Sequence, residues 1–253
     1  MQEARGFRYS SAVRTSVEIS LPVLRSKLRR LASPEDARNL SWYFKTAPGE
    51  YGAGDRFIGV RVPVLRLLAR EFRSLPPPAA AQLLQSPVHE ERLLALLILM
   101  DAYDRAGESG RAAIYRIYMK NLARVNNWDL VDCSAPRIVG PHLEKRSRNI
   151  LFRLARSKIL WRRRVAVLAT FHFIRQGDFA DALRLAELLL RDGHDLMHKA
   201  VGWMLREMGK RDLTELKQFL RKHAVRMPRT MLRYAIEKLP ERERQSYLQA
   251  GKH

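Results

Sequence analysis

The sequence has few of the features that mark secreted and membrane proteins. Its 253 residues include one cysteine, Cys133, so no intramolecular disulfide can form, and a reducing compartment is indicated. The most apolar run, residues 93–100, ends at Asp101 and is far too short to cross a bilayer. The N-terminal residues contain no apolar stretch of the kind that directs secretion. We therefore expect a cytoplasmic protein.

Acidic residues are scarce relative to basic ones. The chain has 47 lysines and arginines against 26 aspartates and glutamates, which gives a formal net charge of +21. So large an excess repels itself unless a polyanion is bound. Nucleic acid is therefore the first candidate partner, and an anionic membrane surface is the second. Hydrophobic residues make up 46% of the chain, which is ample for a folded core.

Patterns typical of β-strands joined by hairpin turns are missing. Apolar residues instead recur at three- and four-residue steps, as in residues 21–32. Prolines and glycines divide the chain into segments of helical length, and Ser33 with Pro34 is typical of a helix start. Short antiparallel helix pairs predict an all-α, HEAT-like solenoid with a concave basic face. A globular helical bundle is the structural alternative.

We predict one domain over residues 21–250, preceded by a mobile tail over residues 1–20. The tail weakly resembles a transit peptide, but its glutamates argue against targeting. Residues 46–63 are rich in proline and glycine and predict a long loop, which is more often functional than not in a compact domain. That loop lacks the Gly-Lys-Ser/Thr ending of a phosphate-binding motif.

The motifs of common catalytic and metal centres are also lacking. His194 and His198 have the spacing of a zinc helix, but the glutamate after the first histidine and a third ligand are missing. Asp129 and Asp132 would be too few ligands for a metal pair. Cys133 has no nucleophile motif around it. We expect neither a metal nor a cofactor.

A tryptophan and an aspartate do lie one helical turn apart. In the segment Asn-Asn-Trp-Asp-Leu-Val-Asp, residues 126–132, an asparagine can cap a helix that carries Trp128 and Asp132 on one face. Such a pair can stabilise a cationic ligand, through the indole face and the carboxylate charge. The plainer alternative is a core tryptophan beside a carboxylate that is bound to backbone or to an arginine.

Residues 144–164 carry a run of lysines and arginines against a single glutamate. A charged run is commonly a solvated face. Because this one is one-signed and rich in arginine, it favours contact with phosphates.

Three segments resemble the signature segments of the AlkD family, which are HEAT-like-repeat DNA glycosylases that excise alkylated purines. They are residues 126–132, 160–168 and 198–210, and residues 43–45 and 57–68 resemble the family's N-terminal segment in the same order. The similarity extends over roughly residues 35–240, and the ordered set is more specific than any one piece.

The resemblance implies roles for particular residues. Trp128 and Asp132 match the tryptophan and catalytic aspartate of the family's Trp-Asp-x-Val-Asp segment, and Trp203 matches its second active-site tryptophan. Arg164 matches the arginine that grips the DNA backbone, and Tyr43 matches an aromatic residue at the edge of the cleft. The further DNA contacts that we expect are Arg61, Arg162, Arg163, Lys199 and Arg206.

The implied activity is that of a monofunctional DNA glycosylase, without lyase activity, on 3-methyladenine and 7-methylguanine in double-stranded DNA. We expect a monomer that is associated with the nucleoid and not with a membrane. The damaged nucleotide would stay stacked, whereas most glycosylases flip it into a pocket. The sequence departs from the family at residues 61–63, where Arg-Val-Pro replaces the frequent Gln-Thr-Pro. The contacts of that loop are therefore open.

Two other functions fit part of the pattern. A non-catalytic HEAT-like module that binds distorted or branched nucleic acid would share the charge, but it would not need Trp128, Asp132 and Trp203 together. A protein-interaction scaffold is a common use of helical solenoids, but the charge excess argues against it. We favour the glycosylase.

Overall fold

The computed structural model describes residues 19–250. The predicted mobile tail falls almost entirely outside this range, so its mobility stays a prediction. The α-helices are α1 (Leu21–Arg30), α2 (Pro34–Tyr43), α3 (Val62–Glu71), α4 (Pro77–Leu83), α5 (His89–Arg105), α6 (Glu108–Lys120), α7 (Trp128–Ser134), α8 (Gly140–His142), α9 (Asn149–Ala155), α10 (Leu160–Arg175), α11 (Ala180–Leu188), α12 (Asp195–Gly209), α13 (Leu213–His223), α14 (Arg229–Ala235) and α15 (Glu241–Gln249).

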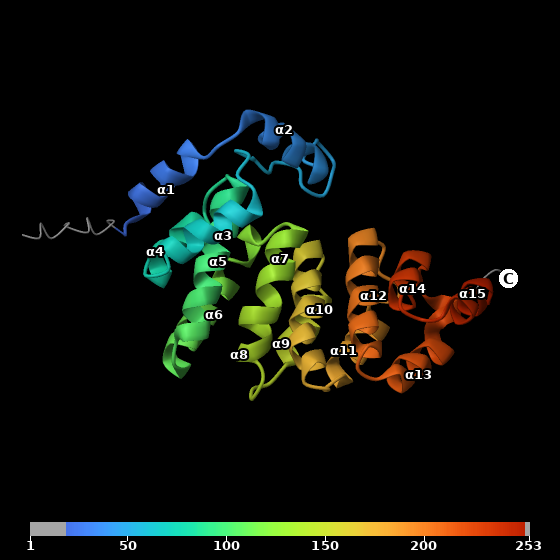
Figure 1. The fold of residues 1–253 in the computed structure, drawn as a ribbon. Coiled ribbons are helices and arrows are strands. Elements are labelled where there is room, and N and C mark those ends of the chain that lie inside the picture. The colour runs from blue at the N-terminus through green and yellow to red at the C-terminus, as the bar shows by residue number, and fades with distance from the viewer. Residues whose placement is uncertain (1–18, 251–253) are drawn as a thin grey trace, which may run out of the picture.

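The helices follow one another through space in the order of the sequence (Figure 1). Helices α7, α10, α12 and α14 form a row in which each packs on the next, and α9, α11 and α13 pack against this row. Within the described residues the extended pairing consists of one isolated bridge, between Arg56 and Val88. The prediction of an all-α helical-repeat solenoid is therefore confirmed.

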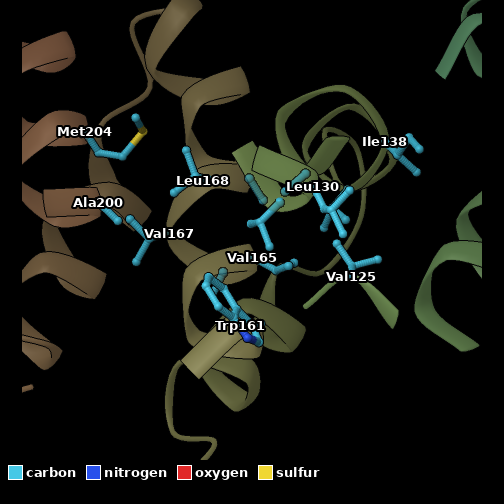
Figure 2. Packing of buried hydrophobic residues seen from close by; sticks show 14 of the residues in the cluster. Val125, Leu130, Ile138, Trp161, Val165, Val167, Leu168, Ala200 and Met204 are labelled. Atoms are coloured by element: carbon cyan, nitrogen blue, oxygen red, sulfur yellow. The ribbon is translucent and has the colours of Figure 1, made fainter. Parts of the chain in front are cut away.

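The core is continuous along the row of helices. Val165 of α10 lies toward Leu130 of α7, and Val167 of the same helix lies toward Ala200 of α12 (Figure 2). A helix that packs on both sides needs apolar residues around most of its circumference, which is why α10 has little amphipathic character. Gly202 brings α12 against α14, because a Cβ there would lie 2.5 Å from the carbonyl oxygen of Met231.

Helix starts follow the sequence signals. Ser33 caps α2 by accepting a hydrogen bond from the amide of Asp36 at 3.2 Å. Asn127 precedes α7, and its side chain accepts from the amide of Trp128 at 2.8 Å. A π-helical turn, Ala135–Val139, continues α7 into α8, since Pro136 cannot donate a hydrogen bond inside a regular helix. Across residues 19–250, every helix is too short or too polar to span a membrane.

Candidate functional site

An ion pair joins α7 and α10, with one residue in the second turn of each helix. Arg164 donates from Nε to Oδ1 of Asp132 at 2.7 Å and from Nη2 to Oδ2 at 2.8 Å. Its third nitrogen, Nη1, donates to the carbonyl oxygen of Leu196 in the first turn of α12. The guanidinium of α10 therefore binds both α7 and α12. The starts of the three helices lie at the same end of the row (Figure 1).

The pair is largely buried. Arg164 is 5% exposed, whereas 16% of the Asp132 side chain is exposed. Burial raises the pKa of Asp132, and the hydrogen bonds and charge of Arg164 act against this rise. The arginine partner that the plainer interpretation of Asp132 proposed is thus present. The remaining exposed part of the carboxylate is the surface that a ligand can reach.

Each nitrogen of Arg164 donates one hydrogen bond and the residue is 5% exposed, so little of its guanidinium faces a phosphate in the free protein. The contact with the DNA backbone implied by the resemblance would use the remaining N–H groups of Nη1 and Nη2, or would exchange one of these bonds. It stays a prediction.

Trp128 occupies the first position of α7 and is half-buried. Its indole stacks on Phe44, with centroids 5.2 Å apart and planes at 15°, and meets the ring of Tyr43 edge-on at 6.0 Å. Phe44 is buried, whereas Tyr43 is 54% exposed. The structure therefore places Tyr43 between solvent and Trp128, at the end of α2.

Trp203 lies on α12, about two turns beyond the Leu196 carbonyl that binds Arg164. It is half-buried, and its indole N–H donates to Glu207 at 3.2 Å. Its ring lies 5.9 Å from that of Phe171 in α10. Trp203 thus shares the α10–α12 interface with the ion pair, but aromatic contacts between it and Trp128 are not found in residues 19–250.

A buried network of charges fixes the start of α7. His89 binds Asp55 through Nδ1 at 2.9 Å and Asp129 through Nε2 at 2.8 Å. Asn127 donates to the same Asp55 oxygen at 3.0 Å. Burial disfavours the imidazolium, but the charges and hydrogen bonds of Asp129 and Asp55 outweigh it and raise the pKa of His89 to about 9. His89 is therefore protonated at neutral pH and donates to both carboxylates.

Asp55 is charged in the same network. Burial would raise the pKa of its carboxyl, but the His89 hydrogen bond and the Arg92 charge outweigh burial and lower it to about 2. Spacing along the chain does not reveal this network, because Asp55 and His89 are 34 positions apart and neither belongs to a motif. The one available signal was that Asp55 lies in the loop of residues 46–63.

That loop is present, although its last two residues, Val62 and Pro63, open α3, where a proline in the first turn is tolerated. The loop folds back onto the end of α2, and a Cβ on Gly52 would lie 2.3 Å from the carbonyl oxygen of Phe44. Tyr51 at its centre meets Trp161 of α10 edge-on at 6.2 Å. The loop therefore contacts α10, the helix that holds Arg164.

The other basic residues expected to contact DNA differ in how free they are. Arg163 is paired with the buried Asp192 at 2.6 Å. Arg162 forms no ion pair with any described residue, and its Nε is buried without a hydrogen-bond partner. Lys199 pairs with Asp195 at 2.7 Å, Arg61 pairs with Asp36 at 2.7 Å, and Arg206 pairs with Glu237. Exposed ion pairs are weak, so phosphates can compete for Lys199 and Arg61, whereas the Arg206 side chain is largely buried between Glu207 and Glu237.

The zinc-spaced histidines have structural partners. Nδ1 of His194 accepts from the amide of Leu196 at 3.1 Å and caps α12, and Nε2 of His198 meets the carbonyl of Asp192 at 2.5 Å. In the described part of the chain, three or more histidine, cysteine, aspartate or glutamate side chains never gather as metal ligands.

Comparison with known proteins gives two matches and one negative result. The model of a family described as DNA alkylation repair enzyme matches residues 24–239. The chain is also similar to the structure of a predicted DNA alkylation repair enzyme from Enterococcus faecalis, with a TM-score of 0.64 and 17% identity. The match covers 83% of this chain and 97% of that one, and at this identity it shows a shared fold. None of the curated proteins matches the sequence.

Proposed function

The chain belongs to the DNA alkylation repair enzyme family, and we propose that it is a monofunctional glycosylase for cationic alkylated purines in duplex DNA. Lesions of the 3-methyladenine and 7-methylguanine type are the substrates. The observation that carries the proposal is the partly exposed Asp132 carboxylate, held on the helix that begins at Trp128.

The chemistry needs little from the protein. A purine alkylated at N3 or N7 carries positive charge, so the electron pair of the C1′–N bond leaves with the base and neutralises it. The sugar becomes an oxocarbenium-like cation, which the Asp132 carboxylate stabilises electrostatically. Water then adds to C1′, and its proton passes to the carboxylate or to solvent. No lysine nucleophile takes part, so the DNA strand stays intact.

In the free protein the Asp132 carboxylate is bound to Arg164 and is not yet directed at a ligand. Separating a buried ion pair leaves each charge without compensation, which is strongly unfavourable. The carboxylate therefore stays bound to Arg164 until another charged group is present. A DNA phosphate offers the guanidinium a second acceptor. As Arg164 shares its donors with that phosphate, Asp132 turns its charge toward the sugar. This exchange reconciles the buried position of Arg164 with a contact to the DNA backbone.

The tryptophans supply the second part of the site. Phe44 supports the Trp128 indole from one side, so the ring can present a fixed surface to a cationic sugar or base. We expect a second indole from Trp203, which lies on α12 and packs against Phe171 of α10, to contact the same nucleotide.

The proposal is tested with oligonucleotide duplexes that each contain one lesion. Purified protein should release free 7-methylguanine and 3-methyladenine, leave uracil and 8-oxoguanine in place, and cause no strand nick before alkali. Tight binding without release would favour the alternative, a non-catalytic module for distorted DNA. Efficient uracil release, or an adduct trapped by borohydride, would contradict the mechanism.

A further inference from the structure

Trp42, on α2, is the most exposed large hydrophobic side chain in the described part of the chain, with 74% of its surface open. Helix α2 buries none of its own residues, so Trp42 is not needed for packing. Single exposed hydrophobic side chains are common on protein surfaces, so the exposure of Trp42 indicates a binding role only in combination with the charges around it.

Two cations flank this indole. The Lys45 ammonium lies 5.2 Å from the Trp42 ring centroid. Lys45 is held there by a left-handed backbone conformation, with φ of 55°, and by the bond from the Gly52 amide to its carbonyl at 3.0 Å. Arg38 lies one helical turn before Trp42, is exposed, and forms no ion pair with the described residues. We name Arg38, Trp42 and Lys45 the α2 stripe.

The α2 stripe is continuous with the site described above. Tyr43, the next residue after Trp42, is half exposed and lies edge-on to Trp128 at 6.0 Å. Lys45 is joined through Gly52 to the loop whose Tyr51 meets Trp161. A polyanion bound at Trp128 would therefore lie close to the end of α2 and to the α2 stripe.

The chemistry of the α2 stripe selects its ligand. A protein partner would be expected to meet more apolar side chains around Trp42, whereas here the neighbours are two cations. A base pair inside a duplex has both faces covered by stacking. An unpaired base has an open π face that can stack on an indole, and the phosphates beside it can meet the cations.

We propose that the α2 stripe binds an unpaired nucleotide, with its base stacked on Trp42 and its phosphates against Arg38 and Lys45. The inference rests on the proposed function in that it places DNA across the face that holds Trp128. Distorted duplexes, in which a base has lost its partner, would then be held more tightly than intact ones.

The test measures binding by fluorescence anisotropy to two labelled duplexes, one fully paired and one with a single extra unpaired nucleotide. The wild-type protein should prefer the bulged duplex by about 5- to 150-fold, the range expected for one stacked base. Trp42→Ala should abolish this preference, with affinity for the paired duplex changed by less than about twofold, and Trp42→Phe should keep part of it. Leu67→Ala, which removes another exposed hydrophobic residue, is the matched control and should behave as wild type.

The cations have their own readout. Replacing Arg38 and Lys45 together by alanine should lower the slope of log affinity against log salt by about two on the bulged duplex. Quenching of tryptophan emission should be stronger with bulged than with paired DNA in the wild type, and this difference should be lost in Trp42→Phe, although Trp128 and Trp203 remain.

An unchanged bulge preference in Trp42→Ala, or none in the wild type, would overturn the inference. These outcomes are independent of base release. Excision of 7-methylguanine without a preference for bulged DNA would support the proposed function and contradict nucleotide binding by the α2 stripe. A preference for bulged DNA that depends on Trp42, without base release, would support the α2 stripe and contradict the proposed function.

Discussion

Asp132 and Arg164 carry most of the functional argument at the scale of single residues. The one-turn spacing of Trp128 and Asp132 followed from the sequence, because i and i+4 side chains share a helix face. The partner of Asp132 did not follow from spacing, since Arg164 is 32 positions away. The arginine-rich run that contains Arg164 suggested a phosphate contact, but charge alone does not show which cations are already bound to carboxylates.

A double-mutant cycle tests the coupling of the pair. Arg164→Ala leaves the Asp132 carboxylate buried without a partner and should lower the free energy of unfolding by about 3 kcal/mol. In the double variant with Asp132→Asn no uncompensated charge remains, so it should be more stable than Arg164→Ala alone. Urea titrations of the four proteins measure this. Strictly additive changes would show that the pair is not coupled.

The start of α7 is the element on which the site depends. Its cap, Asn127, was expected from the sequence, and the loop of residues 46–63 was expected as a break in the helical pattern. The use of that loop was not foreseeable, because Asp55 reaches both His89 and Asn127 only after the chain has folded. A local pattern locates helix ends but says little about buried polar contacts between distant segments.

The pH dependence of stability reports on this network. The pKa of His89 is raised from 6.5 to about 9, so its protonation stabilises the fold. That stabilisation is fully present below about pH 6.5 and is lost as the pH rises through about 9, with a total of about 3 kcal/mol.

Thermal unfolding between pH 6 and pH 10 should therefore show a falling midpoint in the wild type and a flatter profile in His89→Gln. His172, which is partly buried and has a lowered pKa, provides the control variant His172→Gln. An equal dependence of the unfolding midpoint on pH in the wild type and in His89→Gln would show that protonation of His89 does not stabilise the start of α7.

At the scale of the whole molecule, the order of the helices was predictable because prolines, glycines and caps mark their ends. The solenoid followed from helix length and from the short connections between helices. The relative position of Trp203 could not be predicted, since it depends on how α12 packs on α10. The net charge of +21 predicted a polyanion but not which face would receive it.

Salt dependence tests which cations meet the DNA. Affinity for damaged and undamaged duplexes should fall steeply with salt, because phosphate binding releases counterions. Arg162→Ala should lower the log–log slope by about one, since Arg162 has no carboxylate partner in residues 19–250. Arg163→Ala, one residue away and paired with Asp192, should leave the slope unchanged. An unchanged slope in Arg162→Ala together with a lowered slope in Arg163→Ala would show that Arg162 does not contact the DNA.

Single-turnover release of 7-methylguanine by Asp132→Asn tests the central claim most directly. The substitution keeps the shape of the side chain and removes the charge that faces the cationic sugar. The rate constant should fall at least ~100-fold while the variant still binds DNA at least as tightly as the wild type. Asp101→Asn, which alters an exposed carboxylate paired with Arg105, should retain the wild-type rate. A wild-type rate in Asp132→Asn would show that Asp132 does not act in the reaction.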